Sequence, residues 1–269
     1  MIKRLVILGT FVVQLYGVHI GTATHLPDTL LVGQYFTLAT ADNLKNIDGD
    51  VTTNQLGYEL FQYTLRPILY QGDFVYQIIL PYKKQELVSL DENRLGLGDI
   101  TIGVGYFIPN DFEDTELGVL FNLQLPTGRF DPSKTINNGS GHYSSSFEFY
   151  LHKTIGRVIF DGAVKYKYHF KNNDTSVKLG DSYAIESVCG YVVSRNFVIG
   201  PNLSYQWNND NETNAIEDLD TYSSRWNFGV EGILKLNEKM SLLVGGYQDF
   251  NAKNTFEATT ILISVFYSF

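Results

Sequence analysis

Residues 144–170 read SSSFEFYLHKTIGRVIFDGAVKYKYHF, and this stretch decides the fold. After the central Gly-Arg pair, valine, tyrosine and phenylalanine occupy alternate positions, whereas Asp161, Lys165 and Lys167 fall on the opposite face. A period of two is typical of a β-strand with one apolar and one polar face, and does not fit a helix. Gly156-Arg157 suits a two-residue type II′ turn, in which glycine supplies the positive φ. The stretch therefore predicts an antiparallel hairpin.

The same alternation recurs along the chain. It is clear at 99–109, 114–125, 157–171, 196–208 and 225–237, and weaker at 29–40, 55–66, 72–82, 143–155, 180–194, 240–251 and 257–269. These segments make about twelve strands of roughly 10–15 residues, the length of a tilted membrane crossing. Short turns are expected near 67–72, 109–114, 155–157, 194–197 and 237–240, and longer polar loops at 41–54, 83–98, 125–142, 172–180 and 208–224.

An even number of strands, with short turns at one end and long loops at the other, is typical of outer-membrane barrels. We therefore predict an all-β protein, a closed antiparallel transmembrane β-barrel of about twelve strands over residues 24–269. The short turns and both ends of the chain are expected on the periplasmic side. The predicted location is the bacterial outer membrane, where lipid and lipopolysaccharide surround the barrel.

Two arguments place the apolar face outward. A soluble barrel of about twelve strands would enclose more space than side chains fill, and a sandwich would leave open edges. A lysine or arginine that faces lipid near the midplane costs about 2–4 kcal/mol, and Glu116, Asp161, Lys165 and Glu231 all fall on the polar face.

Aromatic residues also gather near the strand ends, as in the two interfacial girdles of outer-membrane barrels. They are Tyr82, Tyr166, Tyr168, Tyr183, Tyr205, Trp207 and Trp226 on the loop side, and Tyr106 and Tyr267 on the turn side.

The two ends of the chain have features expected of an exported and assembled barrel. Lys3 and Arg4 precede an apolar run, so residues 1–23 are predicted to be a signal peptide cleaved after Ala23, with a buried first strand as the alternative. The last strand alternates up to Phe269. It resembles the terminal strand that the barrel assembly machinery recognises, which makes that machinery an expected partner.

Composition argues against several other classes. The net charge is −9, which disfavours nucleic acid as a partner because a phosphate-binding groove needs clustered lysine and arginine. Cys189 is the one cysteine, so no internal disulfide or thiolate metal site is expected. The acidic loop 208–220 matches no EF-hand spacing and is interpreted as solvated, and no cofactor or metal is predicted.

Short motifs resemble one family. Leu95-Gly96-Leu97-Gly98-Asp99-Ile100 opens a strand, and Gln124-Leu125-Pro126-Thr127-Gly128 closes the next one before the Gly-rich segment Gly139-Ser140-Gly141-His142-Tyr143. These segments resemble the family of the MetA-pathway of phenol degradation. The resemblance implies an outer-membrane barrel transporter for small aromatic or other hydrophobic molecules.

The turn at Gly156 also fixes which side chains meet inside the barrel. It places Ser144 opposite His169, Glu148 opposite Lys165 and His152 opposite Asp161. We hypothesise that inward charged residues line the lumen and contact the solute, with a purely structural network as the alternative. The residues are Glu116, Glu148, His152, Asp161, Lys165, Lys167, His169, Arg225, Glu231 and Lys235.

The leading predicted function is passive passage of small molecules, without enzymatic activity. A lipid hydrolase is an alternative, because the His-x-Ser spacing of His142 and Ser144 resembles that of the outer-membrane phospholipase. The Asn-Gly-Arg that follows in that family is absent, and Ser144 is predicted to face the lumen rather than lipid. A structural or adhesion protein that works through its loops is the other alternative.

Overall fold

A computed structural model describes His19, His25, Leu26, residues 28–53 and residues 55–269. The predicted signal peptide, residues 1–23, lies outside the described residues except for His19. Among the residues described, no helix is both long enough and apolar enough to span a bilayer.

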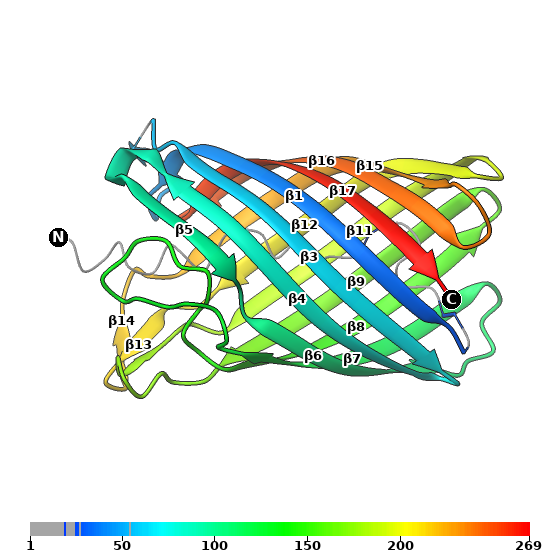
Figure 1. Ribbon diagram of the computed structural model, residues 1–269, viewed down its shortest axis with the longest axis horizontal. Coiled ribbons are helices and arrows are strands. Elements are labelled where there is room, and N and C mark those ends of the chain that lie inside the picture. The colour runs from blue at the N-terminus through cyan, green and yellow to red at the C-terminus, as the bar shows by residue number, and fades with distance from the viewer. Residues whose placement is uncertain (1–18, 20–24, 27, 54) are drawn as a thin grey trace.

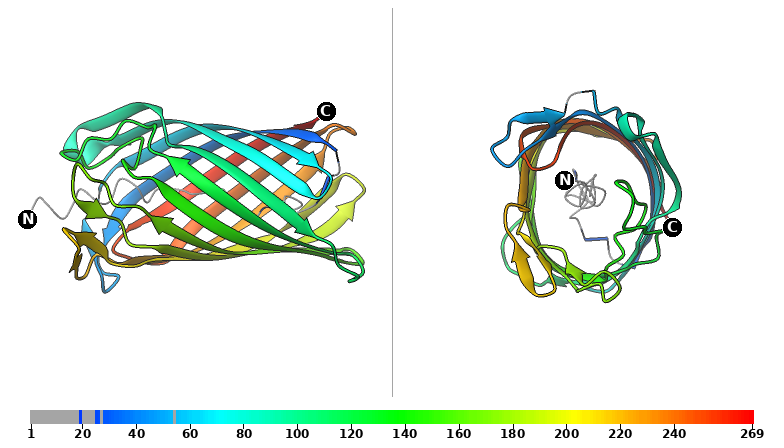
Figure 2. Two further views of the ribbon diagram at one scale, coloured as in Figure 1. Left: turned by 90° about the horizontal axis from the view of Figure 1, so that it is seen from below. Right: turned by 90° about the vertical axis from the view of Figure 1, so that its left-hand side faces the viewer.

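The described residues form a closed antiparallel barrel (Figures 1 and 2). Its sheet has 14 strands within the described residues, of which β2 (Val51–Thr53) and β5 (Glu92–Leu97) are short extensions, so twelve long strands make the wall. The twelve are β1 (Leu30–Lys45), β3 (Tyr58–Gln71), β4 (Phe74–Leu87), β6 (Ile100–Ile108), β7 (Thr115–Leu125), β8 (Ser144–Ile155), β9 (Val158–His169), β11 (Ser182–Ser194), β12 (Phe197–Asn208), β15 (Ser223–Lys235), β16 (Met240–Lys253) and β17 (Phe256–Ser268).

The barrel closes where the last strand meets the first. β1 pairs with β17 from Leu31↔Ser268 to Leu44↔Phe256, so neither strand leaves an open edge. Because no water is present in hydrocarbon to bond a free strand edge, this closure is what lets a sheet cross a membrane. The predicted closed barrel of twelve strands is confirmed.

Several strands reach further than predicted. β3 runs to Gln71, so only Gly72 and Asp73 form the turn that was expected over 67–72. The pairing of β3 with β4 skips Arg66 and Pro67, which accommodates a proline that has no N–H to donate.

The long loops also contain strands. The predicted loop 83–98 is instead a hairpin in which β5 pairs back onto β4, and the predicted loop 41–54 contains the end of β1 and β2. A small sheet of β10 (Val177–Lys178), β13 (Asn211–Thr213) and β14 (Ile216–Asp218) lies among the loops at the same end (Figure 1). Above the membrane both faces of a strand contact water, so both faces can carry polar residues. The alternation with period two is then lost, and such extensions cannot be predicted from it.

The predicted direction of the two faces is confirmed. Phe228 and Val230 are 49% and 47% exposed on the outer surface, whereas the adjacent Glu231 is 1% exposed and Asp161 fully buried. Aromatic side chains form contacting rows on the outside near the loop end. Ring centroids of Tyr183 and Trp207 are 5.5 Å apart. Those of Tyr205 and Trp226 are 4.7 Å apart, as expected for an interfacial girdle.

A charge on the outer face at mid-strand tests this placement. Val230→Arg should lower the free energy of unfolding in lipid vesicles by about 2–4 kcal/mol, because arginine at the bilayer midplane cannot be solvated. Urea unfolding followed by tryptophan fluorescence measures the change. Ile216→Arg, on the exposed extracellular β14, is the matched control and should have little effect. Equal effects of the two substitutions would contradict the membrane placement.

Candidate functional site

The hairpin of β8 and β9 has the predicted register, with Ile155 opposite Val158 and a positive φ of 60° at Gly156. His152 Nδ1 lies 2.6 Å from Asp161 Oδ1, and Lys165 Nζ lies 3.1 Å from Glu148 Oε1. Both pairs face the barrel interior, where their side chains are largely buried. The pairing is therefore confirmed, whereas contact of these groups with a solute stays a prediction.

Other predicted lining residues also have interior partners. Lys167 Nζ donates a hydrogen bond to Gln124 Oε1 at 2.8 Å, and His169 Nε2 lies 3.4 Å from Ser182 Oγ. Arg225 forms an ion pair with Asp249 at 3.4 Å.

Three predicted residues lie elsewhere along the barrel axis. Glu116, near the periplasmic end of β7, accepts a hydrogen bond from the backbone N–H of His25. Glu231 is buried and accepts hydrogen bonds from the Tyr247 hydroxyl at 2.7 Å and from Asn202 at 3.3 Å. Lys235 is exposed at the periplasmic end of β15, at the rim rather than inside.

His19 is inside the barrel, with its Nδ1 2.9 Å from Glu231 Oε2. Cleavage after Ala23 would remove it from the mature protein. The hydrogen bonds that Glu231 accepts from Tyr247 and Asn202 do not involve residues 1–23, so such cleavage leaves them in place.

Sequence reading missed the amide residues that link the charged groups. Gln77 on β4, Gly103 on β6 and Asn122 on β7 are in register, and Gln77 Nε2 donates to Asn122 Oδ1 at 2.7 Å. A Cβ at position 103 would lie 2.1 Å from that oxygen, so only glycine lets the two amides meet across β6.

This bond is the centre of a longer chain of polar contacts. Arg66 Nε donates to Gln77 Oε1 at 2.8 Å, and Asn122 Nδ2 donates to Glu148 Oε1 at 2.8 Å. Glu148 then binds Lys165, so one hydrogen-bonded belt crosses the inner wall from β3 to β9. The signal that could have found it is the presence of polar residues at matching positions of adjacent strands with a glycine between them.

Asp99 fastens the loop between β7 and β8. Its carboxylate accepts hydrogen bonds from the backbone N–H groups of Gly128 at 3.0 Å and Ser140 at 2.7 Å, from the Ser140 hydroxyl at 2.7 Å and from Gln124 at 2.9 Å. A Cβ at position 139 would lie 2.4 Å from the Gly128 carbonyl oxygen. The three motifs singled out in the sequence therefore meet at one point and act as a clamp.

The clamped loop, residues 126–143, folds into the barrel. Thr135 to Ser140 are all buried, and the backbone carbonyl of Asn137 accepts a hydrogen bond from Gln85 on β4 at 2.8 Å. Ile136 is fully buried against Tyr58 and Leu60 of β3. Seen along the barrel axis, this green loop projects into the ring of strands, so it narrows the extracellular entrance (Figure 2).

His142 ends this loop, and burial lowers its pKa. Its Nδ1 lies 3.1 Å from the Phe170 carbonyl oxygen. A histidine with a depressed pKa holds its place as the neutral form, so this packing weakens as the pH falls below the usual value of about 6.5.

The lipid-hydrolase alternative finds no support in this geometry. Ser144 is 1% exposed and faces the interior opposite His169. Within the described residues its hydroxyl forms no hydrogen bond, to histidine or otherwise. A serine nucleophile needs a base within hydrogen-bond reach and access to its lipid substrate.

The acidic loop has ordinary structural contacts. Asp210 accepts hydrogen bonds from the backbone N–H groups of Thr221 and Tyr222, both at 2.6 Å, and Asp218 accepts one from Thr213. In the part of the chain that the structure describes, no group of three or more His, Cys, Asp or Glu could hold a metal ion.

The inner surface is not polar all round, contrary to the simple alternation. β16, β17 and β1 turn Leu243, Leu262, Phe266 and Tyr35 inward, where they pack together near the periplasmic end. Nearer the loops a second apolar cluster, defined by Ala39, Ala41, Leu56, Tyr58, Leu60, Leu87, Ile136, Phe256 and Ala258, continues the same side of the barrel. We call these two clusters together the apolar wall; buried polar side chains, among them Thr37 and Thr260, lie between them on the same strands.

The clamp can be tested by one isosteric change. Asp99→Asn leaves an amide that cannot accept all four hydrogen bonds, and losing a bond to a charged group costs about 1.5–3 kcal/mol. The loop should then leave the barrel, and trypsin should cut at Arg129 and Lys134 at least tenfold faster in the purified protein. Asp174→Asn, in an exposed turn, makes the same change of charge and should leave the digestion rate unchanged. Slow cleavage in Asp99→Asn would show that the carboxylate does not hold the loop.

Solved structures that resemble this chain are barrels of the bacterial outer membrane. The COG4313 outer membrane channel from Pseudomonas putida F1 superposes with a TM-score of 0.86 at 19% identity, covering 94% of this chain and 100% of that one. The KdgM porin gives a TM-score of 0.51 at 11% identity, over 88% of this chain and 99% of the porin. The translocator domain of autotransporter NalP from Neisseria meningitidis gives 0.51 at 8% identity, over 89% and 87% of the two chains.

These likenesses establish the barrel of the bacterial outer membrane as the fold. No curated protein matches the chain at a significant level. The model of the family described as MetA-pathway of phenol degradation matches residues 32–265, almost the whole barrel. The chain therefore belongs to the MetA-pathway of phenol degradation family, as its clamp motifs predict.

Proposed function

We propose that the barrel is a passive outer-membrane channel for small molecules with an aromatic or other apolar body. The apolar wall is the observation that carries the proposal. In a pore for water-soluble solutes the inward positions are polar, because they face a water-filled lumen. Here Leu243 and Leu262 turn inward from neighbouring strands and pack with Tyr35 and Phe266.

The energetic argument concerns desolvation of the solute. Apolar surface removed from water contributes about 25 cal/mol per Å², so a solute with an apolar body gains from contact with the apolar wall, whereas a sugar does not. The polar belt on the facing wall gives the same solute a place for its polar group. An interior with two unlike walls favours amphipathic solutes over fully polar ones.

The inward loop supports selective passage. Residues 126–143 occupy part of the extracellular entrance and are held by the buried Asp99 carboxylate. A constriction fixed by side-chain and backbone contacts brings the loop itself into the path of an entering solute.

Two resemblances support the same function. The description of the family refers to phenol degradation, and the similar barrel from Pseudomonas putida F1 is described as an outer membrane channel. Neither identifies a solute for this chain, and the choice of an apolar solute depends on the inner wall.

Uptake of two amino acids by proteoliposomes tests the proposal. Phenylalanine and asparagine have the same zwitterionic head group and differ in the apolar body. Phenylalanine should enter liposomes containing the purified protein at least twofold faster in a swelling assay, although it is larger. A water-filled sieve would give the opposite order. Protein-free liposomes are the control, and absence of any flux through correctly folded protein would reject the channel.

A further inference from the structure

We propose that a cavity on the polar wall binds the carboxylate group of the permeating solute, so that the transported class is an apolar or aromatic monocarboxylate. This inference rests on the proposed channel function and adds the charge of the solute to it. The cavity lies at the inner face of β3 to β9, below the clamped loop. We call it the carboxylate cavity and define it by Arg66, Gln124, Ser144, Glu148, Lys165 and Lys167.

Charge is the first observation. Three cations line the carboxylate cavity against one carboxylate, that of Glu148, which gives a formal balance of 3 − 1 = +2. The whole chain carries a net charge of −9, so the sign of this site is opposite to that of the protein as a whole. A positive cavity with low-dielectric walls concentrates anions.

Two of the three cations have no carboxylate partner. Lys165 pairs with Glu148, but within the described residues Arg66 and Lys167 form no ion pair. Arg66 donates its Nε–H to the neutral amide of Gln77, and Lys167 donates to the neutral amide of Gln124. A buried cation without a nearby anion is unfavourable, and Lys167 is only 8% exposed. An anion that enters the cavity would supply the missing negative partner.

An unused hydroxyl is the second observation. Ser144 lines the carboxylate cavity and is 1% exposed, and in the described part of the chain its Oγ has no hydrogen-bond partner. Buried hydroxyl groups almost always form a hydrogen bond. An unpaired hydroxyl that faces a cavity beside two lysines therefore indicates a ligand that accepts a hydrogen bond from it. A carboxylate accepts hydrogen bonds and donates none, which fits this set of donors.

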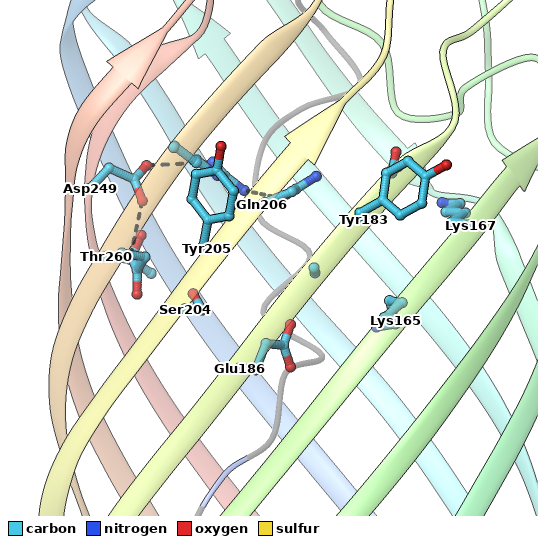
Figure 3. A pocket seen from close by; sticks show the side chains of 13 residues that line it. Lys165, Lys167, Tyr183, Glu186, Ser204, Tyr205, Gln206, Asp249 and Thr260 are labelled. Atoms are coloured by element: carbon cyan, nitrogen blue, oxygen red, sulfur yellow. Dashed lines mark hydrogen bonds and ion pairs between the residues drawn. The ribbon is translucent and has the colours of Figure 1, made fainter.

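The size of the cavity fits one small group. Its volume is about 40 Å³, and about 10–15 Å³ suffices for one water, so a carboxylate fits and a whole solute does not. Lys165 and Lys167 also line a second cavity of about 60 Å³ on the other side of β9, together with Glu186, Arg225 and Asp249 (Figure 3). Lys165 and Lys167 therefore line both cavities, and their ammonium groups can contact an anion in either cavity.

The apolar body of the solute has its own surface. In the strand order β8 and β9 lie six places around the barrel from β17 and β1, on opposite sides of a twelve-stranded ring. The carboxylate cavity therefore faces the apolar wall across the lumen. A molecule whose carboxylate occupies the cavity would direct its ring or alkyl body towards the apolar wall.

Calorimetric titration of the purified protein in detergent at pH 7 tests the charge requirement. Benzoate should bind at least tenfold more tightly than benzamide, which has the same ring and size but no charge. Acetate should bind more weakly than benzoate, because it has no apolar body. Equal affinity for benzoate and benzamide would overturn the proposal.

One substitution with a matched control tests the site itself. Lys167→Gln keeps a side chain that can donate to Gln124 and removes the charge, so benzoate affinity should fall about tenfold or more while benzamide affinity stays the same. Lys235→Gln removes the same charge from the exposed periplasmic rim and should change neither affinity. Ser144→Ala should weaken benzoate binding by a smaller factor. Equal benzoate affinity in the Lys167 and Lys235 variants would overturn the site.

Ion selectivity separates this inference from the proposed function. Under a tenfold KCl gradient across a planar bilayer, the reversal potential should indicate a preference for chloride that Lys167→Gln reduces and Lys235→Gln preserves. Channels that conduct without anion preference and without benzoate binding would reject the carboxylate cavity and leave the channel intact. Benzoate binding by a folded protein that passes no ions or solutes would reject the channel and retain the cavity.

Discussion

The structure depends on the need to satisfy every backbone hydrogen bond away from water. Inside a bilayer an unpaired strand edge costs several kcal/mol for each exposed group, so a sheet that crosses must close on itself. The pairing of β1 with β17 meets this requirement along nearly the full length of both strands. Closure then creates the two environments on which all other features depend, a hydrocarbon surface outside and an enclosed space within.

The enclosed space sets a second requirement, because charged groups there are largely withdrawn from water. The chain meets it with a belt of side chains that bond to one another across adjacent strands, from Arg66 to Lys165. Gly103 makes the belt continuous by leaving room for two amides to meet over its backbone. The Asp99 clamp extends the same network into the inward loop through Gln124.

The distribution of these groups around the barrel gives the interior its chemical character. One side holds the belt, the clamp and the lysine pair of β9, and the other holds two clusters of aliphatic and aromatic residues with a few buried hydroxyl and amide groups beside them. In the proposed channel, a solute would pass between these two unlike sides.

The sequence by itself determined the barrel, its strands and the direction of its faces. Alternation is a local property, and lipid makes it strict, so residues such as Val164 and Lys165 could be assigned to opposite faces without a structure. The turn at Gly156 likewise fixed the pairs His152–Asp161 and Glu148–Lys165, because a two-residue turn sets the register of both strands.

Tertiary structure alone decided the clamp, the inward loop and the apolar wall. Asp99 meets Gly128 and Ser140 across 29 and 41 residues of chain, a separation over which no periodic pattern carries information. The inner face is less constrained than the outer one, since an inward position tolerates leucine or glutamine according to its neighbours across the lumen. Those neighbours exist only once the first and last strands have joined, and only the closed barrel shows where each inward side chain lies.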